Sequence, residues 1–244
     1  MRRFTLQPEQ LADGRVTFDA GESRHLTRVL RLRPGDTVVA TDGAGRDYTV
    51  RIESLGDAAV GTVLAEAAGV AASPLAITLI QGVPKGDKME AIVRAATELG
   101  VARVLPALCE RTIVRLETSR WRERARRWQR VAREAAKQSG RAVIPEVDPP
   151  RPLSEWLPTE GPADLALCLW EGGGAPLGGV LTAAAEPRSA RVVIGPEGGL
   201  ARGEVDLART HGFTVVSLGP RILRAETAGP AIVAILQSRF GDLG

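Results

Sequence analysis

Short runs of alternating apolar and polar residues dominate the chain up to about residue 70, and they predict β-strands. Turn residues such as Asp42-Gly43 and Gly56-Asp57 separate these runs. One helix is expected at residues 22–30, where Leu26, Val29 and Leu30 fall on one side. The expected strands are residues 15–19, 37–41, 48–52 and 60–64. The pattern predicts a small β-barrel with one helix.

From Leu75 onward, apolar runs alternate with segments of helical periodicity, which is typical of a mostly parallel sheet covered on both faces. The expected strands are residues 76–81, 103–108, 165–169, 192–194 and 214–218, and the expected helices are residues 87–99, 119–139, 177–185, 204–211 and 227–240. The small residues at 67–74 indicate a linker, so we expect one domain at 1–72 and an α/β domain at 73–244.

Two of these helices carry apolar stripes that indicate core positions. The stripe of the 87–99 helix, which Gly100 ends, comprises Met89, Ile92, Val93, Ala96 and Leu99. The stripe of the 119–139 helix comprises Trp121, Ala125, Trp128, Val131 and Ala135.

Composition narrows the class of protein. With 44% hydrophobic and 25% charged residues, the chain has the composition of an ordinary globular protein. It contains no apolar run long enough for a membrane span, and no apolar signal core follows the N-terminus, so we expect a cytoplasmic protein. Cys109 and Cys168 lie in apolar surroundings and are expected to be buried, reduced thiols. Two histidines are too few for a His-rich centre, and no metal is expected.

Positive charge is concentrated in one predicted helix. Residues 120–141 contain nine basic residues against Glu123 and Glu134. Such a run is either a solvated face or a surface for RNA phosphates, and like-charge repulsion favours the anionic partner. Glu134 and Gln138 lie one turn apart on this helix and face either the active site or a partner subunit.

Two loops near the C-terminus have the strongest functional signal. Each follows a short apolar strand, contains Gly-Pro and precedes a helix, one at residues 195–199 and the other at 218–224. In an open α/β sheet, ligands bind beyond the carboxyl ends of the strands, where these loops are expected. The first loop is neither a phosphate-binding P-loop nor a dinucleotide fingerprint. The alternative for the first loop is a tight turn without a ligand.

Several motifs carry a resemblance to a known family. Residues 194–199 read Ile-Gly-Pro-Glu-Gly-Gly, and residues 218–227 read Leu-Gly-Pro-Arg-Ile-Leu-Arg-Ala-Glu-Thr. Further motifs are His-Leu-Thr-Arg-Val-Leu-Arg at 25–31, Pro-Gly-Asp at 34–36, Lys-Gly-Asp-Lys-Met-Glu at 85–90, Glu-Leu-Gly-Val at 98–101 and Glu-Ala-Ala-Lys-Gln-Ser at 134–139. In these motifs, which span almost the whole chain, the protein resembles the knotted methyltransferases of the SPOUT superfamily and, within it, the RsmE family.

The RsmE family methylates N3 of one uridine in 16S ribosomal RNA with S-adenosylmethionine. The resemblance implies a PUA-like barrel at 1–72 and an α/β SPOUT trefoil-knot domain at 73–244. It also implies a homodimer that acts on 16S ribosomal RNA or the small ribosomal subunit, without a metal or a membrane. The cofactor-binding residues that it implies are Leu169, Trp170, Gly195, Pro196, Glu197, Gly198, Gly199, Leu218, Gly219, Ile222, Leu223 and Arg224. For Ile222 and Leu223, simple core packing is the alternative.

The chemistry of the implied reaction suggests roles for charged residues. Uridine N3 is a poor nucleophile until it loses its proton, so a cation that stabilises the anion and a carboxylate that takes the proton are needed. Arg224 and Glu226 are the candidates, with Glu197 as a competing base; alternatively, Arg224 and Glu226 pair with each other and cap the last helix.

The candidate RNA-binding residues are Arg2, Arg3, His25, Arg28, Arg31, Lys85, Lys88, Arg126 and Arg130. A cation at the start of the 87–99 helix opposes the helix dipole, which favours an anionic partner for Lys85 and Lys88.

Two other functions are compatible with this scaffold. One is a non-catalytic RNA-binding factor in ribosome assembly, and the intact loops at 195–199 and 218–227 count against it. The other is a SPOUT methyltransferase that acts on another rRNA or tRNA nucleotide, such as a tRNA ribose 2′-hydroxyl. The N-terminal barrel and the motif at 85–90 favour the RsmE family instead.

Overall fold

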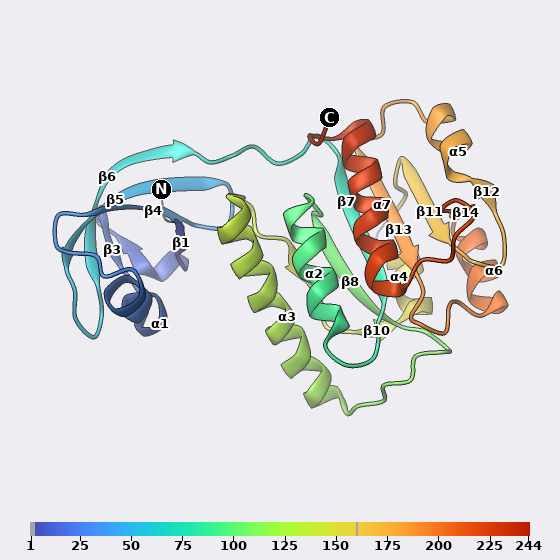
Figure 1. Cartoon of the computed structure of the whole chain (residues 1–244), viewed down its shortest axis with the longest axis horizontal. Coiled ribbons are helices and arrows are strands. Elements are labelled where there is room, and N and C mark those ends of the chain that lie inside the picture. The colour runs from blue at the N-terminus through green and yellow to red at the C-terminus, as the bar shows by residue number, and fades with distance from the viewer. Residues whose placement is uncertain (1–2, 160) are drawn as a thin grey trace. The chain divides into compact units, whose positions relative to one another are not determined.

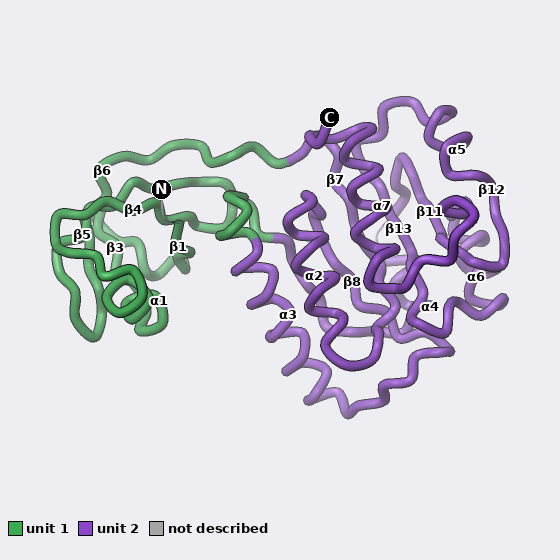
Figure 2. The backbone as a smooth tube through the Cα atoms, viewed as in Figure 1, with its two compact units in different colours: residues 1–72, 136–144 green, residues 73–135, 145–244 purple. Residues whose placement is uncertain are grey.

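The computed structural model describes residues 3–159 and 161–244, and the chain divides into two compact units (Figures 1 and 2). The first contains the chain up to Ala72 together with residues 136–144, and the second contains residues 73–135 and 145–244. The segment 136–144 belongs in sequence to the predicted second domain. The division into domains at 1–72 and 73–244 therefore stays a prediction.

The first unit is built on a six-stranded sheet with the order β1-β4-β5-β6-β3-β2. Its strands are β1 (Arg3–Thr5), β2 (Leu11–Ala12), β3 (Arg15–Thr17), β4 (Thr37–Thr41), β5 (Arg46–Ser54) and β6 (Val60–Ala68). Neighbouring strands are antiparallel except β1 and β4. Phe4, Phe18 and Leu26 are among the buried residues of its core. A 3₁₀ turn, η1 (Pro8–Gln10), links β1 to β2.

The helix expected at residues 22–30 differs from its prediction. It consists of α1 (Ala20–Arg24), which Asp19 caps by accepting a hydrogen bond from the Glu22 N–H, and a π-helical turn, η2 (His25–Val29). A π turn holds more residues than an α turn, so the residues within it do not keep the α-helical spacing of the core face, although Leu30, just after the turn, packs against the core. Leu26 is fully buried as expected, whereas Val29 is 69% exposed.

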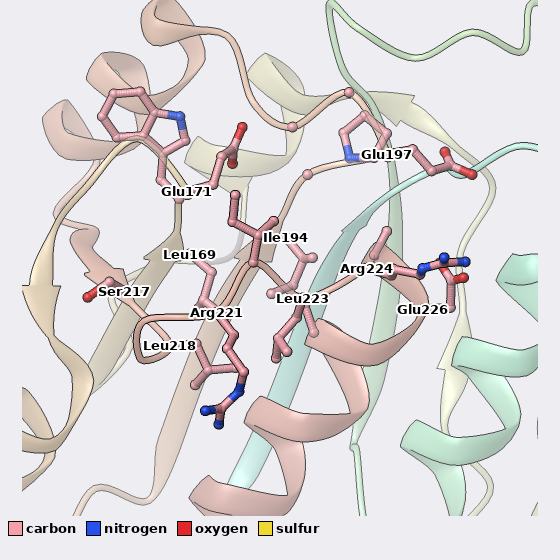
Figure 3. Close-up of a pocket in the computed structure, with 18 of the residues that line it drawn as sticks. Leu169, Glu171, Ile194, Glu197, Ser217, Leu218, Arg221, Leu223, Arg224 and Glu226 are labelled. Carbon is pink, nitrogen blue, oxygen red and sulfur yellow. The ribbon is translucent and has the colours of Figure 1, made fainter.

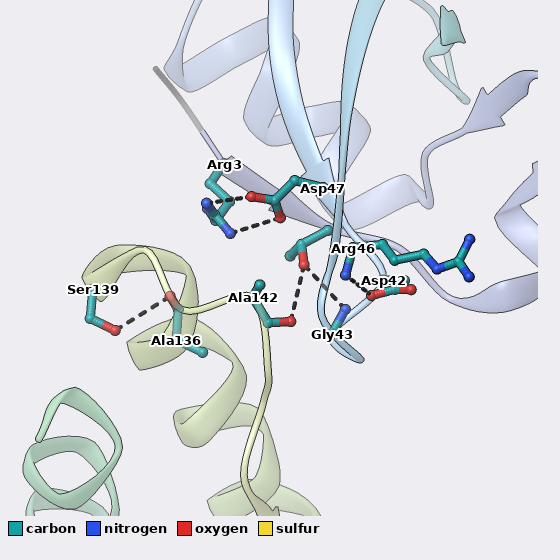
Figure 4. A network of polar contacts seen from close by, with 9 residues as sticks. Arg3, Asp42, Gly43, Arg46, Asp47, Ala136, Ser139 and Ala142 are labelled. Carbon is teal, nitrogen blue, oxygen red and sulfur yellow. Dashed lines mark hydrogen bonds and ion pairs between the residues drawn. The ribbon is translucent and has the colours of Figure 1, made fainter. Parts of the chain in front are cut away.

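The segment 136–144 pairs with the turn that follows β4 (Figure 4). The Ile144 N–H donates to the Gly43 carbonyl at 3.0 Å, and the Gly45 N–H donates to the Ala142 carbonyl at 3.2 Å. Lys137 is 8% exposed and pairs with Glu22 at 2.8 Å. Paired backbone groups and a compensated buried charge explain why this segment belongs to the first unit.

The second unit is an α/β domain with a parallel sheet of order β10-β8-β7-β13-β11-β14-β12, and β9 pairs with β8. Its strands are β7 (Ala76–Gly82), β8 (Arg103–Leu108), β9 (Glu146–Val147), β10 (Arg151–Pro152), β11 (Leu165–Leu169), β12 (Ala175–Pro176), β13 (Ser189–Ile194) and β14 (Thr214–Ser217). The helices are α2 (Lys88–Glu98), α3 (Thr118–Ser139), α4 (Leu153–Thr159), α5 (Leu177–Ala183), α6 (Arg202–Thr210) and α7 (Ala225–Phe240). From Ala136, α3 belongs to the first unit.

Helices cover both faces of this sheet, as the continuous apolar strands predict. One buried cluster joins the sheet to α2, α3, α5 and α7, and a second cluster joins it to α4 and α6. The stripe residues Met89, Ile92 and Trp121 are all in the first cluster, so the predicted core faces of α2 and α3 are confirmed. Helix α4 was not predicted, because it is short and contains Pro158.

Both cysteines are buried and free, as predicted. Burial is the main cause that raises the pKa of the Cys168 thiol to about 12. Among the residues that the structure describes, no helix is long and apolar enough to cross a membrane. In the same part of the chain, no cluster of three His, Cys, Asp or Glu side chains is arranged to hold a metal ion.

The order of the strands determines where the two glycine loops meet. β11 lies between β13 and β14, with Leu169 opposite both Ile194 and Val216. The loops at 195–199 and 218–224 follow β13 and β14, so they flank the carboxyl end of β11 on its two sides.

Candidate active site

A cavity of about 510 Å³ lies at the carboxyl ends of β11, β13 and β14 (Figure 3). Its walls come from the end of β11, from the loop after β13, from the loop that leads into α7, and from Lys85 and Lys88 near the start of α2. The volume is in the range of pockets that bind small molecules.

All twelve residues that the resemblance implies for the cofactor line this cavity, so the structure brings them together; their roles stay predictions. They are Leu169, Trp170, Gly195, Pro196, Glu197, Gly198, Gly199, Leu218, Gly219, Ile222, Leu223 and Arg224. Glu226 also lines the cavity. Sequence reasoning missed Glu171, Ile194, Ser217, Pro220, Arg221, Ala225 and Ala228. All of these except Ala228 adjoin a predicted residue in the sequence, and that adjacency is the signal that would have found them.

The loop at 195–199 needs glycine for steric reasons. Gly199 has a φ of +70°, and a Cβ on it would collide with the Glu171 carboxylate. A Cβ on Gly195 would lie 2.8 Å from the Gly199 carbonyl carbon, because the loop folds back on itself. The Gly199 N–H donates to the Pro196 carbonyl at 2.9 Å and closes the turn. The loop is therefore compact, with its backbone at the surface of the cavity.

Side chains outside the loop fix its position. The Arg111 guanidinium donates to the Gly198 carbonyl at 3.0 Å. Glu204, in the first turn of α6, accepts from the Ala201 N–H at 2.9 Å and from the Glu110 N–H at 2.8 Å. These contacts join the loop to the start of α6 and to the segment after β8.

The second loop contributes apolar surface. Leu218 and Leu223 are partly buried and pack against the larger core cluster, together with Ile194 and Leu169 of the cavity wall. Ile222 is 83% exposed. The core-packing alternative therefore applies to Leu223 and is wrong for Ile222.

Two carboxylates and one ammonium meet at the edge of the cavity. The Lys88 Nζ lies 3.0 Å from Glu197 Oε1 and 3.5 Å from Glu226 Oε2. Burial raises the pKa of the Glu197 carboxyl, but the hydrogen bond from Lys88 and the backbone N–H groups of Glu197 and Lys85 outweigh it and hold that pKa below its usual value. The hydrogen bond to Glu197 raises the pKa of Lys88 against the opposing effect of burial.

Arg224 does not pair with Glu226 as the alternative reading supposed. Its side chain makes no ion pair or hydrogen bond with any residue in the described part of the chain, and Glu226 pairs with Lys88 instead. Arg224 occupies the N-cap position of α7 without a side-chain cap bond. Its guanidinium is therefore available to a ligand in the cavity.

The candidate RNA-binding residues fall into different environments. Arg2 lies outside the described residues. Arg3 makes a bidentate pair with Asp47 at 2.9 and 2.7 Å (Figure 4), and His25 stacks edge-on against Phe4. The exposed cations of this set are Arg28, Arg31, Lys85, Arg126 and Arg130, and Lys88 is partly buried. Lys85 and Lys88 both line the cavity.

Comparison with known families identifies the class of protein. Residues 71–237 match the model of an RNA methyltransferase domain, and residues 18–60 match that of an RNA methyltransferase PUA domain. The chain is therefore an RNA methyltransferase with an N-terminal PUA domain. The predicted α/β domain with a parallel sheet, preceded by a small PUA domain, is confirmed.

Individual relatives identify the family. The chain is 37% identical to the Ribosomal RNA small subunit methyltransferase E of Synechocystis sp., covering 95% of this chain and 76% of the relative. It is 36% identical to the crystal structure of a Ribosomal RNA small subunit methyltransferase E from Neisseria gonorrhoeae bound to S-adenosyl methionine, with a TM-score of 0.89 and full coverage of both chains. A Legionella pneumophila methyltransferase structure in complex with the same cofactor has a TM-score of 0.90 at 29% identity, covering 99% and 98% of the chains. The chain belongs to the ribosomal RNA small subunit methyltransferase E family.

Proposed function

We propose that this protein transfers a methyl group from S-adenosylmethionine to N3 of a uridine in 16S ribosomal RNA. The observation that carries the proposal is that both glycine loops line one and the same cavity, with Arg224 and Glu226 at its edge. The names of the relatives and the cofactor in the Neisseria gonorrhoeae and Legionella pneumophila structures support it.

The residues of the cavity fit the cofactor. Leu169, Ile194 and Leu223 provide apolar walls, and the closed turn of residues 195–199 lets backbone groups approach a flat ligand closely. When bound, S-adenosylmethionine supplies an electrophilic methyl group. The protein then has to align a nucleophile with it and make that nucleophile competent.

Arg224 is the proposed stabiliser of the uridine anion. Loss of the N3 proton leaves negative charge that spreads to O2 and O4 of the base. The Arg224 guanidinium lines the cavity and is not engaged by another described side chain, so it is available to donate to either oxygen.

Glu226 is the proposed proton acceptor, and the structure favours it over Glu197. Three donors hold Glu197, and its lowered pKa makes it a weak base. Among the described residues, Glu226 is held by Lys88 alone, at 3.5 Å from its Oε2, so fewer donors stabilise its negative charge than that of Glu197. The proposed transfer moves the N3 proton to this carboxylate directly or through one water.

Binding of the RNA backbone is proposed for the exposed arginines of α3. Arg126 and Arg130 are solvent-exposed, whereas Arg127 between them pairs with Glu90 at 2.7 Å.

We also propose, as the resemblance implies, that the protein is a cytoplasmic homodimer.

The function is tested by nucleoside analysis of ribosomal RNA from cells that lack the protein. N3-methyluridine should be absent from 16S RNA and should return when the purified protein and S-adenosylmethionine are added to that RNA or to small subunits. Unchanged N3-methyluridine in the deleted strain would overturn the proposal.

Substitution of Gly199 tests the cofactor site. Gly199→Val places a branched side chain at a positive φ and against Glu171, so S-adenosylmethionine binding should be lost while the fold remains. Isothermal titration calorimetry measures the affinity, and circular dichroism checks the fold. Gly203→Ala, at a position with open space on α6, is the matched control and should bind normally. If Gly199→Val bound S-adenosylmethionine with the affinity of the parent, this loop would not be part of the cofactor site.

Substitution of Arg224 tests the proposed anion stabilisation. Arg224→Ala should lower the single-turnover rate on the order of a hundredfold with little change in cofactor affinity, because one well-placed donor is lost. The deficit should shrink at alkaline pH, where uridine ionises unaided. Arg202→Ala is the control, since this exposed arginine at the start of α6 does not line the cavity, whereas Arg221 does although it points in a different direction from Arg224 (Figure 3). If Arg224→Ala kept a near-parental single-turnover rate at neutral pH, Arg224 would have a structural role and would not stabilise the uridine anion.

Charge reversal on α3 tests the RNA surface. The double variant Arg126→Glu and Arg130→Glu should weaken RNA binding and flatten its dependence on salt, because fewer counterions are released on binding. Fluorescence anisotropy across a salt series measures both effects, and cofactor affinity should stay constant. If the salt slope matched that of the parent, this face of α3 would be only a solvated surface.

A further inference from the structure

Lys88 joins three separate elements of the second unit. It is the first residue of α2, Glu197 is in the loop after β13, and Glu226 is in the first turn of α7. One ammonium lies 3.0 Å from the first carboxylate and 3.5 Å from the second. The side chains of Lys88, Glu197 and Glu226 are 33%, 21% and 25% exposed, so water screens these contacts only in part.

The charge of Lys88 is already compensated inside the protein. The sequence predicted an anionic partner, because a cation at the start of a helix opposes the helix dipole. Two carboxylates provide that partner, and together they carry more negative charge than the ammonium carries positive charge. Little attraction for an RNA phosphate remains at Lys88.

Lys85 is in a different position, although it is only three residues away. Its backbone N–H donates to both oxygens of Glu197, at 3.3 and 3.2 Å, while its side chain is exposed. A substitution of the Lys85 side chain therefore keeps this backbone contact. Lys85 and Lys88 therefore lie at the same site, but only Lys88 contacts the carboxylates of Glu197 and Glu226 through its side chain.

We infer that Lys88 is a positioning residue of the methyl-transfer site: its ammonium ties the loop after β13 to the start of α7 and orients the Glu226 carboxylate. The inference rests on the proposed function, because Glu226 is the proposed proton acceptor. Without the ammonium, Glu197 and Glu226 are two like charges at one edge of the cavity and repel each other. The two loops then lose a common anchor, and Glu226 turns away from the substrate.

The test compares Lys88→Met, Lys88→Arg and Lys85→Met in the full-length protein. Lys88→Met should lower the single-turnover rate at saturating RNA and cofactor on the order of tenfold to a hundredfold, because misplacement of a reacting group is costly. RNA affinity and its salt slope should change little, and Lys88→Arg should restore part of the rate. Lys85→Met should weaken RNA binding but leave the contacts of Glu197 intact, because Lys85 holds that carboxylate only through its backbone N–H.

A double-variant cycle separates positioning from a general loss of structure. If Lys88 acts through the Glu226 carboxylate, Lys88→Met should cost much less rate in a Glu226→Gln background than in the parent. Equal losses in the two backgrounds, or a loss of RNA affinity and salt slope with an intact rate, would overturn the inference.

A measurement without RNA distinguishes failure of this inference from failure of the proposed function. By carboxyl ¹³C NMR, the pKa of Glu197 should lie below its ordinary value in the parent and should rise in Lys88→Met, since Lys88 and the Lys85 and Glu197 N–H groups are what lower it. A parent that methylates no uridine N3 would refute the function and, with it, the catalytic part of the inference. An active parent with an unaltered Glu197 titration in Lys88→Met would refute the inference alone.

Discussion

The position of β11 between β13 and β14 is the constraint on which the site depends. Its parallel register sets Leu169 opposite Ile194 on one side and Val216 on the other. Hydrogen bonds of a ladder fix such a register, and burial on both faces makes a slip costly, because it would expose apolar residues. Two loops that are separated in sequence by α6 and β14 therefore end at one edge of the sheet, where they enclose a common cavity.

The charges at this edge are arranged around Lys88. The ammonium contacts Glu197 and Glu226, while Arg224 on the same wall is left available for a ligand. This arrangement gives two carboxylates at one cavity different properties. Glu197 is held by Lys88 and by the backbone N–H of Lys85, whereas Glu226 is contacted by Lys88 alone among the described residues, at the longer distance of 3.5 Å. The difference decides which carboxylate the proposed mechanism uses as the base.

Sequence patterns predicted much of the α/β domain because its elements are long and strongly periodic. The strands at 103–108 and 165–169 are confirmed to the residue, and the apolar face of α2 is confirmed. The pattern was less informative where local structure departs from regular geometry. The π turn at His25–Val29 changes the direction of Val29, and the segment 136–144 joins the first unit through pairing with residues distant in sequence. Neither feature has a periodic signal.

By itself, the sequence determined the α/β fold class, the family and most of the residues that line the cavity, because the motifs at 194–199 and 218–227 are local and specific. Only the tertiary structure decided which charged side chains form ion pairs with one another. Arg3, expected at RNA, is paired with Asp47; Lys88, also expected at RNA, holds two carboxylates; and Arg224, a possible partner of Glu226, is left without one. The partner of a charge is set by the distance between elements far apart in sequence, and residue type and spacing along the chain do not contain that distance.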